Sequence, residues 1–288
     1  MFLAKKLKTE IISCDSRQFY KELKIGTSKP SKKNFKNIKH HFINNLSIKN
    51  NYNIYLYEKD VIKILKKIFK KNNIVIMVGG SCLYENTIIK GINRIPNIKK
   101  KKLYKLRKKL NNKNIKYLLK KLKKKDYSFY KKLNNKKDKR KIIRALEIIK
   151  ITKKKFSYFL KKKIKKRPFN KYLRIGLILK RKYIYNNIDK KVNLMIKNGL
   201  LNEANNLFKK YKNKNKINAL NTIGYKEIFK FLSKKINLLD CIKEIKKNSK
   251  NYAKRQILWY KNKKNIKWFN PKKKKKILYY IISKIENK

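Results

Sequence analysis

Two short polar segments have residue types suited to chemistry, and each follows an apolar run. The first is Asp15-Ser16-Arg17-Gln18, and the second is Gly79-Gly80-Ser81. A carboxylate at the end of a strand, such as Asp15, is placed to act as a general base. Two successive glycines let the backbone approach an anionic ligand closely. Each segment also has an ordinary structural explanation, since Asp15 could cap a helix and Gly79-Gly80 could be a simple strand-to-helix turn.

The surrounding pattern predicts a parallel sheet that would position these segments. Residues 10–14 and 74–78 are short apolar runs, and residues 58–71 between them carry apolar side chains on one helical face. Strand, helix and strand form the unit of a parallel α/β sheet, and continuous apolar runs indicate strands covered on both faces. A further strand is expected over 172–179. Ligands bind beyond the carboxyl ends of such strands, which favours the two polar segments as a site.

Three parts of the chain follow from the pattern. We expect an α/β core over 1–92, a helical insertion over 93–170, and a return strand with C-terminal helices over 171–288. The insertion loses the strand signal and spaces its leucines and isoleucines as in helices. In the last part, one helix should end at Asn198-Gly199, where glycine suits a left-handed cap, and a long helix should cover about 239–261.

The composition gives a strongly basic protein. Its 288 residues include 87 Lys and Arg against 15 Asp and Glu, a net charge of +72, which favours polyanionic partners. Only nine of the basic residues are Arg, and Asn and Ile are abundant as well. Since Lys, Asn and Ile share A/T-rich codons, compositional drift explains most of this charge. The charge alone therefore does not establish nucleic-acid binding, and the few Arg residues are more informative than the Lys runs.

Several classes of protein are disfavoured. No apolar stretch reaches eighteen residues, and the N-terminus lacks the apolar region of a signal peptide. The three cysteines are widely spaced, and the only two histidines, His40 and His41, are adjacent. This spacing gives no zinc site and no identifiable metal site, and it fits a reducing cytoplasm.

The order of several short motifs resembles that of the tRNA dimethylallyltransferases, also called tRNA isopentenyltransferases or the IPP transferase family. The matching segments occur in the family's order along nearly the whole chain: residues 10–20, Ile25 to Pro30, His40-His41, 78–84, Arg144 to Glu147, Thr222 to Lys226, and 253–259. The resemblance implies a P-loop kinase-like α/β core with a helical insertion.

The resemblance also implies an activity. The family transfers a dimethylallyl group from dimethylallyl diphosphate to the exocyclic amine of the adenosine just 3′ of the tRNA anticodon. Asp15 matches the base that takes a proton from that amine, and Ser81 matches a family threonine near the tRNA substrate. A target adenine must leave its stack to expose this amine. Gln18 is suited to reading adenine by paired hydrogen bonds. Implied partners are the tRNA anticodon stem-loop and dimethylallyl diphosphate, with Mg²⁺ and nucleotide (ATP) binding, in a cytoplasmic monomer.

Further residues match segments of the family that face tRNA. They are Asp15, Ser16, Arg17 and Gln18; Arg140, Lys141, Ile142, Ile143 and Arg144; Asn221, Thr222, Gly224, Tyr225 and Lys226; and Lys254, Arg255 and Gln256.

Two departures from the family are visible. A family arginine that steadies the diphosphate matches Lys191, which keeps the charge but loses the bidentate fork. The family also opens with a strand and Gly-x-x-x-x-Gly-Lys-[Ser/Thr], which cradles phosphates, and this sequence has no such motif. Residues 3–10 are similar to the end of the helix that follows that loop.

Three hypotheses are therefore open. The first is an active transferase whose true start lies upstream and supplies the phosphate loop. The second is a tRNA-binding remnant without catalysis, which applies if the chain truly starts at Met1. The third is a related transferase that acts on a free adenine nucleotide, which would leave the basic insertion without a partner.

Overall fold

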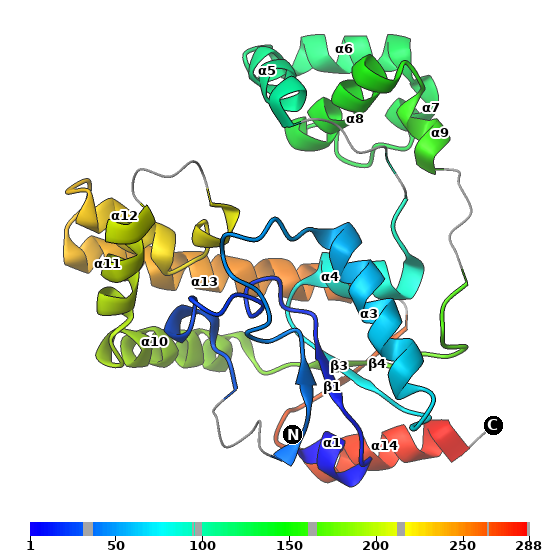
Figure 1. Cartoon of the computed structure of the whole chain (residues 1–288), viewed down its shortest axis with the longest axis vertical. Helices are drawn as coiled ribbons and strands as arrows, with labels where there is room; N and C mark the ends of the chain where they lie inside the picture. The colour runs from blue at the N-terminus through cyan, green and yellow to red at the C-terminus, as the bar shows by residue number, and fades with distance from the viewer. Residues whose placement is uncertain are drawn as a thin grey trace. The chain divides into compact units, whose positions relative to one another are not determined.

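The structure, a computed structural model, describes residues 1–30, 37–93, 95, 100–160, 166–211, 217–263 and 265–286. The chain divides into two compact units (Figure 1). Unit 1 consists of Met1–Ile89 and Arg167–Lys288, and unit 2 consists of Lys90–Lys166. The sequence predicts an insertion over 93–170, and the second unit covers nearly the same range.

Unit 1 contains short parallel strands and most of the helices. Its strands are β1 (Ile11–Ser13), β2 (His40–His41), β3 (Ile76–Val78), β4 (Arg174–Leu177) and β5 (Ile266–Phe269). Its helices are α1 (Phe2–Lys6), α3 (Ile54–Ile68), α4 (Cys82–Lys90), α10 (Arg181–Lys197), α11 (Leu200–Tyr211), α12 (Tyr225–Leu232), α13 (Leu238–Lys261) and α14 (Lys274–Glu286), with short 3-10 turns η1 (Ile25–Thr27) and η2 (Asn218–Leu220).

The strands form two parallel sheets. One has the order β2-β1-β3, in which Ile11 lies opposite both His40 and Ile76. The other joins β4 to β5, with Arg174 opposite Ile266. The α/β class with parallel strands is therefore confirmed. Strands β2 and β5 were not predicted, because a two-residue strand and a strand of alternating exposure carry little apolar signal.

The expectation that all strands are covered on both faces is wrong for two of them. Every residue of β1 is buried, because β1 pairs on both edges. Strands β3 and β4 pair on one edge only among the described residues, and Val78 and Leu177 at their carboxyl ends are 54% and 59% exposed. Both strands are also shorter than the apolar runs that predicted them.

Helix α3 begins and packs as its sequence dictates. The side chain of Asn53 accepts hydrogen bonds from the N–H groups of Tyr55 and Leu56, which would otherwise lack partners at the helix start. Tyr57, Val61 and Leu65 recur every four residues and are buried on one face. The hydroxyl of Tyr57 donates to the Ser13 carbonyl oxygen over 2.9 Å, which ties α3 to the end of β1.

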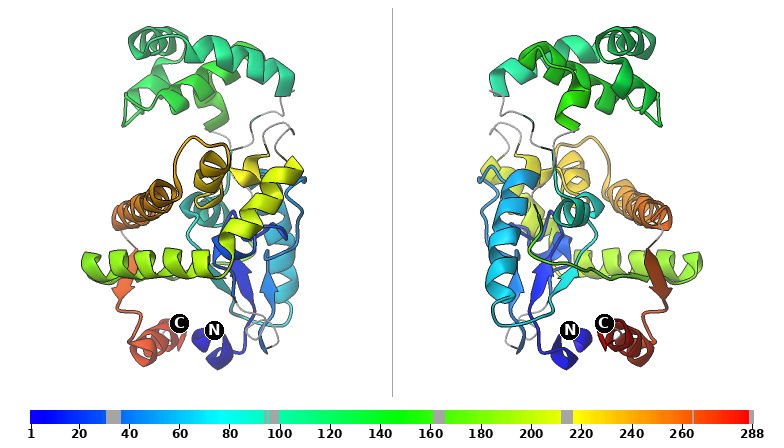
Figure 2. Two further views of the ribbon diagram at one scale, coloured as in Figure 1. Left: turned by 90° about the vertical axis from the view of Figure 1, so that its left-hand side faces the viewer. Right: turned by 90° about the vertical axis from the view of Figure 1, so that its right-hand side faces the viewer.

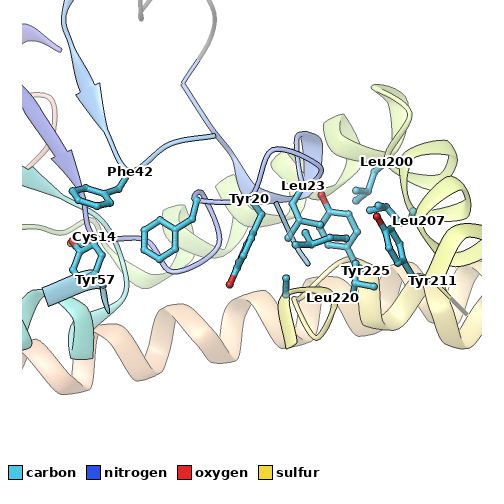
Figure 3. Close-up of a cluster of buried hydrophobic side chains, with 14 of the residues drawn as sticks. Cys14, Tyr20, Leu23, Phe42, Tyr57, Leu200, Leu207, Tyr211, Leu220 and Tyr225 are labelled. Carbon is cyan, nitrogen blue, oxygen red and sulfur yellow. The ribbon is translucent and has the colours of Figure 1, made fainter. Parts of the chain in front are cut away.

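One large apolar core joins β1 to the C-terminal helices. Figure 3 shows its side chains, with Tyr57, Phe42 and Cys14 near the sheet and Tyr225, Leu200 and Leu207 among the helices. Tyr20 and Leu23 lie between the two groups. Helices α10 and α13 pack against each other (Figure 2). Helix α10 ends where the sequence predicts, with Gly199 at φ +91°.

Unit 2 is helical, with α5 (Lys100–Asn111), α6 (Ile115–Lys125), α7 (Tyr127–Lys131), α8 (Lys139–Thr152) and α9 (Phe156–Leu160). Its core is formed by one face of each of the longer helices, including Leu118, Leu122 and Ile142. A fully buried carboxylate, Glu147, accepts two hydrogen bonds from the Arg107 guanidinium, at 2.6 and 2.8 Å. This charged pair links α5 to α8 inside the unit.

Candidate functional site

The carboxyl ends of β1 and β3 bring the two polar segments together. The backbone N–H of Ser16 donates to the Ser81 hydroxyl oxygen over 3.0 Å, and the two serine hydroxyls lie 3.2 Å apart. Ser81 is 9% exposed, so these contacts are largely shielded from water. Asp15 therefore lies at the same sheet edge as Ser81, as neighbouring parallel strands require.

Glycine is required at position 79 by the close approach of these two strand ends. A Cβ at Gly79 would lie 2.6 Å from the Cys14 carbonyl carbon and 2.8 Å from the Asp15 nitrogen. Backbone atoms cannot move aside as a side chain can, so any larger residue must push the strand ends apart. At Gly80, a Cβ would lie 2.1 Å from the amide nitrogen of Gln256 on α13. The two glycines thus let neighbouring segments approach closely at the site, in addition to forming the turn after β3.

The electrostatic surroundings of Asp15 suit a proton acceptor. Burial raises the pKa of this carboxyl above its ordinary value, while the N–H and charge of Arg17 and the charge of Lys191 oppose the rise. The Arg17 N–H donates to Asp15 Oδ1 over 2.9 Å, which fixes the orientation of the carboxylate. Burial also lowers the pKa of Lys191, and the charge of Asp15 raises it. Lys191, on α10, is thus within electrostatic range of this carboxylate.

Arg17 and Gln18 have partners within the chain. The Arg17 guanidinium donates to the carbonyl oxygens of Asn218 at 3.0 Å and Asn221 at 3.5 Å, which holds η2 beside the site. The Gln18 amide nitrogen donates to the carbonyls of Thr27 and Ser28 at 3.3 Å, and its oxygen accepts from the Ser13 hydroxyl. In this structure the Gln18 amide is thus committed to the protein, and a paired reading of adenine by Gln18 would require these bonds to break.

The segment 221–226 is only partly available for a ligand. Asn221 is exposed and Lys226 half-buried, but Thr222, Gly224 and Tyr225 are buried. These three positions therefore support the fold of the segment, and direct tRNA contact by them stays a prediction. Tyr225 is fully buried, and its hydroxyl donates to Glu203 over 2.5 Å and accepts the Gly26 N–H over 3.1 Å.

The other two buried members of that segment stabilise the turn before α12. The Thr222 hydroxyl donates to the Ala219 carbonyl oxygen over 2.6 Å. Gly224 has φ +98°, and its N–H donates to the Glu227 carboxylate over 2.8 Å, which satisfies this donor at the start of α12. The residues of this segment that match the family thus stabilise the fold as well as contribute to the surface.

The α8 residues divide in the same way. Arg140 and Lys141 are exposed at the start of the helix, whereas Ile142 and Ile143 are 0% and 4% exposed. The side chains of the two isoleucines pack in the core of unit 2, so a tRNA contact at these positions would involve their backbone, and that contact stays a prediction. Arg144 is half-buried and lies 3.4 Å from the Glu147 carboxylate, so it shares a charged partner inside unit 2.

Helix α13 supplies both an exposed basic surface and a contact with the site. Lys254 and Arg255 are exposed, while the Gln256 amide donates to the Gly80 carbonyl oxygen over 2.8 Å. Sequence reasoning missed Tyr252, whose hydroxyl donates to the same oxygen over 3.1 Å. The four-residue spacing from Gln256 could have indicated it, since residues i and i+4 share a helix face.

Two further features bound what the site can hold. A cavity of about 220 Å³ at the end of β4 is lined mainly by apolar residues of β4, α10 and α13, with Gln256 at its wall. Among the residues that the structure describes, no three His, Cys, Asp or Glu side chains gather in a way that could hold a metal ion.

Within the same residues, no helix is long and apolar enough to cross a bilayer.

Comparison with known proteins gives a consistent result. Residues 18–263 match the family described as IPP transferase. A tRNA dimethylallyltransferase of Christiangramia forsetii is 44% identical over 96% of this chain and 90% of its own length. The tRNA dimethylallyltransferase 1 of Bacteroides fragilis is 38% identical over 99% of this chain and 92% of its own.

Solved structures agree with these relatives. The full-length tRNA isopentenylpyrophosphate transferase from Bacillus halodurans matches with a TM-score of 0.71 and 30% identity, covering 99% of this chain and 91% of that protein. A eukaryotic dimethylallyltransferase described as acting on tRNA matches with a TM-score of 0.76 and 27% identity, over 93% of this chain and 69% of its own.

Proposed function

The chain belongs to the IPP transferase family, and we infer that it transfers a dimethylallyl group to the exocyclic amine of the adenosine 3′-adjacent to the tRNA anticodon. The observation that carries this inference is the pair of contacts between Ser16 and Ser81, which bring Asp15 and Ser81 to one sheet edge. A half-buried carboxylate with a raised pKa is suited to receive the proton that an attacking amine must lose.

The chemistry needs few protein groups. As the exocyclic nitrogen forms a bond to the allylic carbon, the bond from that carbon to the diphosphate oxygen breaks and diphosphate leaves. The nitrogen then carries an extra proton, which passes to the Asp15 carboxylate. In this proposal Ser81 and Ser16 hold the two strand ends in register, so that the carboxylate faces the extruded base.

Dimethylallyl diphosphate is proposed as the donor. Lys191 supplies a positive charge within electrostatic range of Asp15, and the cavity beside Gln256 offers an apolar wall for a prenyl chain. The described residues do not form a metal site, so we derive no step through Mg²⁺. If Mg²⁺ takes part, its ligands would come chiefly from the diphosphate and water, as is usual for this ion.

The acceptor test separates the three hypotheses. The protein purified from its own cells, with any upstream segment that it carries there, is incubated with labelled dimethylallyl diphosphate and either tRNA or a free adenine nucleotide, and tRNA binding is measured in parallel. We expect label in tRNA only. Binding without label would favour a tRNA-binding remnant, and label in the free nucleotide would favour the nucleotide transferase.

The pH dependence of transfer should report on Asp15. Because burial raises the pKa of this carboxyl, it loses its charge on acidification earlier than an ordinary Asp, whose pKa is about 3.9. The single-turnover rate on bound tRNA should therefore fall as pH decreases through a pKa above that ordinary value. A rate that stays level down to the ordinary value would contradict the role of Asp15 as base.

The exposed cations at the start of α8 should contact tRNA phosphates. Replacing Arg140 and Lys141 with Gln should weaken tRNA binding and reduce the salt dependence of log K by about two, since each lost contact removes about one. Arg144 is left intact because of its contact with Glu147. The matched control is the change of Lys123 and Lys124, exposed at the end of α6, to Gln. An equal reduction in both double variants would assign the effect to the overall charge.

A further inference from the structure

The carbonyl oxygen of Gly80 has an unusual number of partners. The Tyr252 hydroxyl donates to it over 3.1 Å and the Gln256 amide over 2.8 Å. The Cys82 thiol also approaches it at 3.7 Å. The Cys82 N–H donates to it as well, over 3.2 Å, so the two bonds from α13 add to a contact within the turn itself. The peptide that joins Gly80 to Ser81 is thereby held at both ends, since the Ser81 hydroxyl contacts Ser16.

Tyr252 also reaches beyond this carbonyl. Burial raises the pKa of the Tyr252 phenol most and the negative charge of Asp15 raises it further, while the Ser81 hydroxyl lowers it. One hydroxyl on α13 thus touches the turn that carries Ser81 and lies within the field of the proposed base. Tyr252 is 38% exposed and does not belong to the apolar core, so packing does not account for the hydroxyl.

We propose that Tyr252 is a positioning residue of the transfer reaction, which holds the Gly80 carbonyl, and with it the peptide that joins Gly80 to Ser81, so that Ser81 keeps Ser16 and Asp15 in place. The proposal rests on the proposed function and adds to it a residue outside the matched segments. Gln256 anchors the same carbonyl one helical turn later, so Tyr252 and Gln256 act as a pair.

A comparison of Tyr252→Phe with Tyr260→Phe tests the proposal. Both changes remove a hydroxyl from α13 and keep the ring, but the Tyr260 hydroxyl acts on the pKa of the Cys82 thiol, whereas Tyr252 donates to the Gly80 carbonyl. With Tyr252→Phe, we expect turnover to fall about tenfold while the KM for tRNA changes less than about twofold. With Tyr260→Phe, we expect turnover close to that of the unaltered chain.

Two further readouts distinguish positioning from a general loss of stability. The double variant Tyr252→Phe with Ser81→Ala should be no slower than Ser81→Ala alone, because Tyr252 acts through Ser81. Without any donor present, hydrogen exchange of the Ser16 amide, which bonds to the Ser81 oxygen, should be several-fold faster in Tyr252→Phe than in Tyr260→Phe.

The outcomes separate failure of this proposal from failure of the proposed function. If the unaltered chain transfers no label to tRNA, the proposed function fails, and the exchange rate of the Ser16 amide still decides the role of Tyr252. If the unaltered chain is active and Tyr252→Phe matches it in both turnover and exchange, the proposal is overturned. It is also overturned if the losses in the double variant multiply.

Discussion

Replacement of Asp15 by asparagine should lower the turnover of dimethylallyl transfer by about 10²-fold or more and leave tRNA affinity nearly intact. Asparagine keeps the side-chain oxygen that accepts the Arg17 N–H, so the loop geometry should survive. What it loses is the ability to take a proton from the amine. Single-turnover rates with saturating tRNA, measured beside a tRNA-binding titration, separate the two effects.

The same variant should be at least as stable as the unaltered chain. Burial raises the pKa of Asp15 in the folded state, so its charged form costs folding free energy at neutral pH, and that cost disappears as pH falls through the raised pKa. A neutral amide removes the cost at every pH. A clear decrease in Tm, or unchanged turnover, would contradict the assignment of Asp15 as a buried base.

Replacement of Gly79 by alanine should disrupt both the fold and the site. The added Cβ would meet the backbone of Cys14 and Asp15 at 2.6 and 2.8 Å, so the ends of β1 and β3 must separate. Overpacking of this kind costs about 1–3 kcal/mol. Because the displaced atoms carry Asp15, turnover should fall about 10²-fold, well beyond what the stability change explains. Thermal unfolding and single-turnover rates measure the two losses.

Gly199→Ala provides the control for that experiment. Gly199 has φ +91° at the end of α10, and no atom lies within 4 Å of an added Cβ. The left-handed backbone costs a non-glycine residue about 1–2 kcal/mol, a similar loss of stability at a distance from Asp15. If Gly199→Ala reduces turnover as much as Gly79→Ala, the close approach of the strand ends is not what the site needs.

The local pattern predicted the elements that carry the site. The apolar runs before Asp15 and Gly79 are strands β1 and β3, and the helix between them and the cap at Gly199 are found where their spacing placed them. The P-loop kinase-like α/β class and the family resemblance are confirmed by relatives and solved structures over nearly the whole chain. The strands, the helix and the cap depend on residues that are close together in the sequence, so they can be predicted from one sequence.

Long-range contacts could not be predicted in this way. The Arg17 guanidinium holds carbonyls some 200 residues later, and the Gln18 amide is held by the loop at 27–28. Matched motifs likewise do not reveal whether a residue supports a surface or forms it. Tyr225 and Ile142 lie in tRNA-matched segments and are buried, because those segments also pack a core. Tyr252 lies outside every matched segment and still contacts the site.

The most direct measurement is the position of the new group on tRNA. The chain is incubated with dimethylallyl diphosphate and unmodified tRNA, and nuclease fragments of the anticodon loop are sequenced by mass spectrometry. The account predicts one dimethylallyl group, in place of one hydrogen, on the exocyclic nitrogen of the adenosine immediately 3′ of the anticodon. Modification of another nucleotide, or tRNA that binds and remains unmodified, would contradict it.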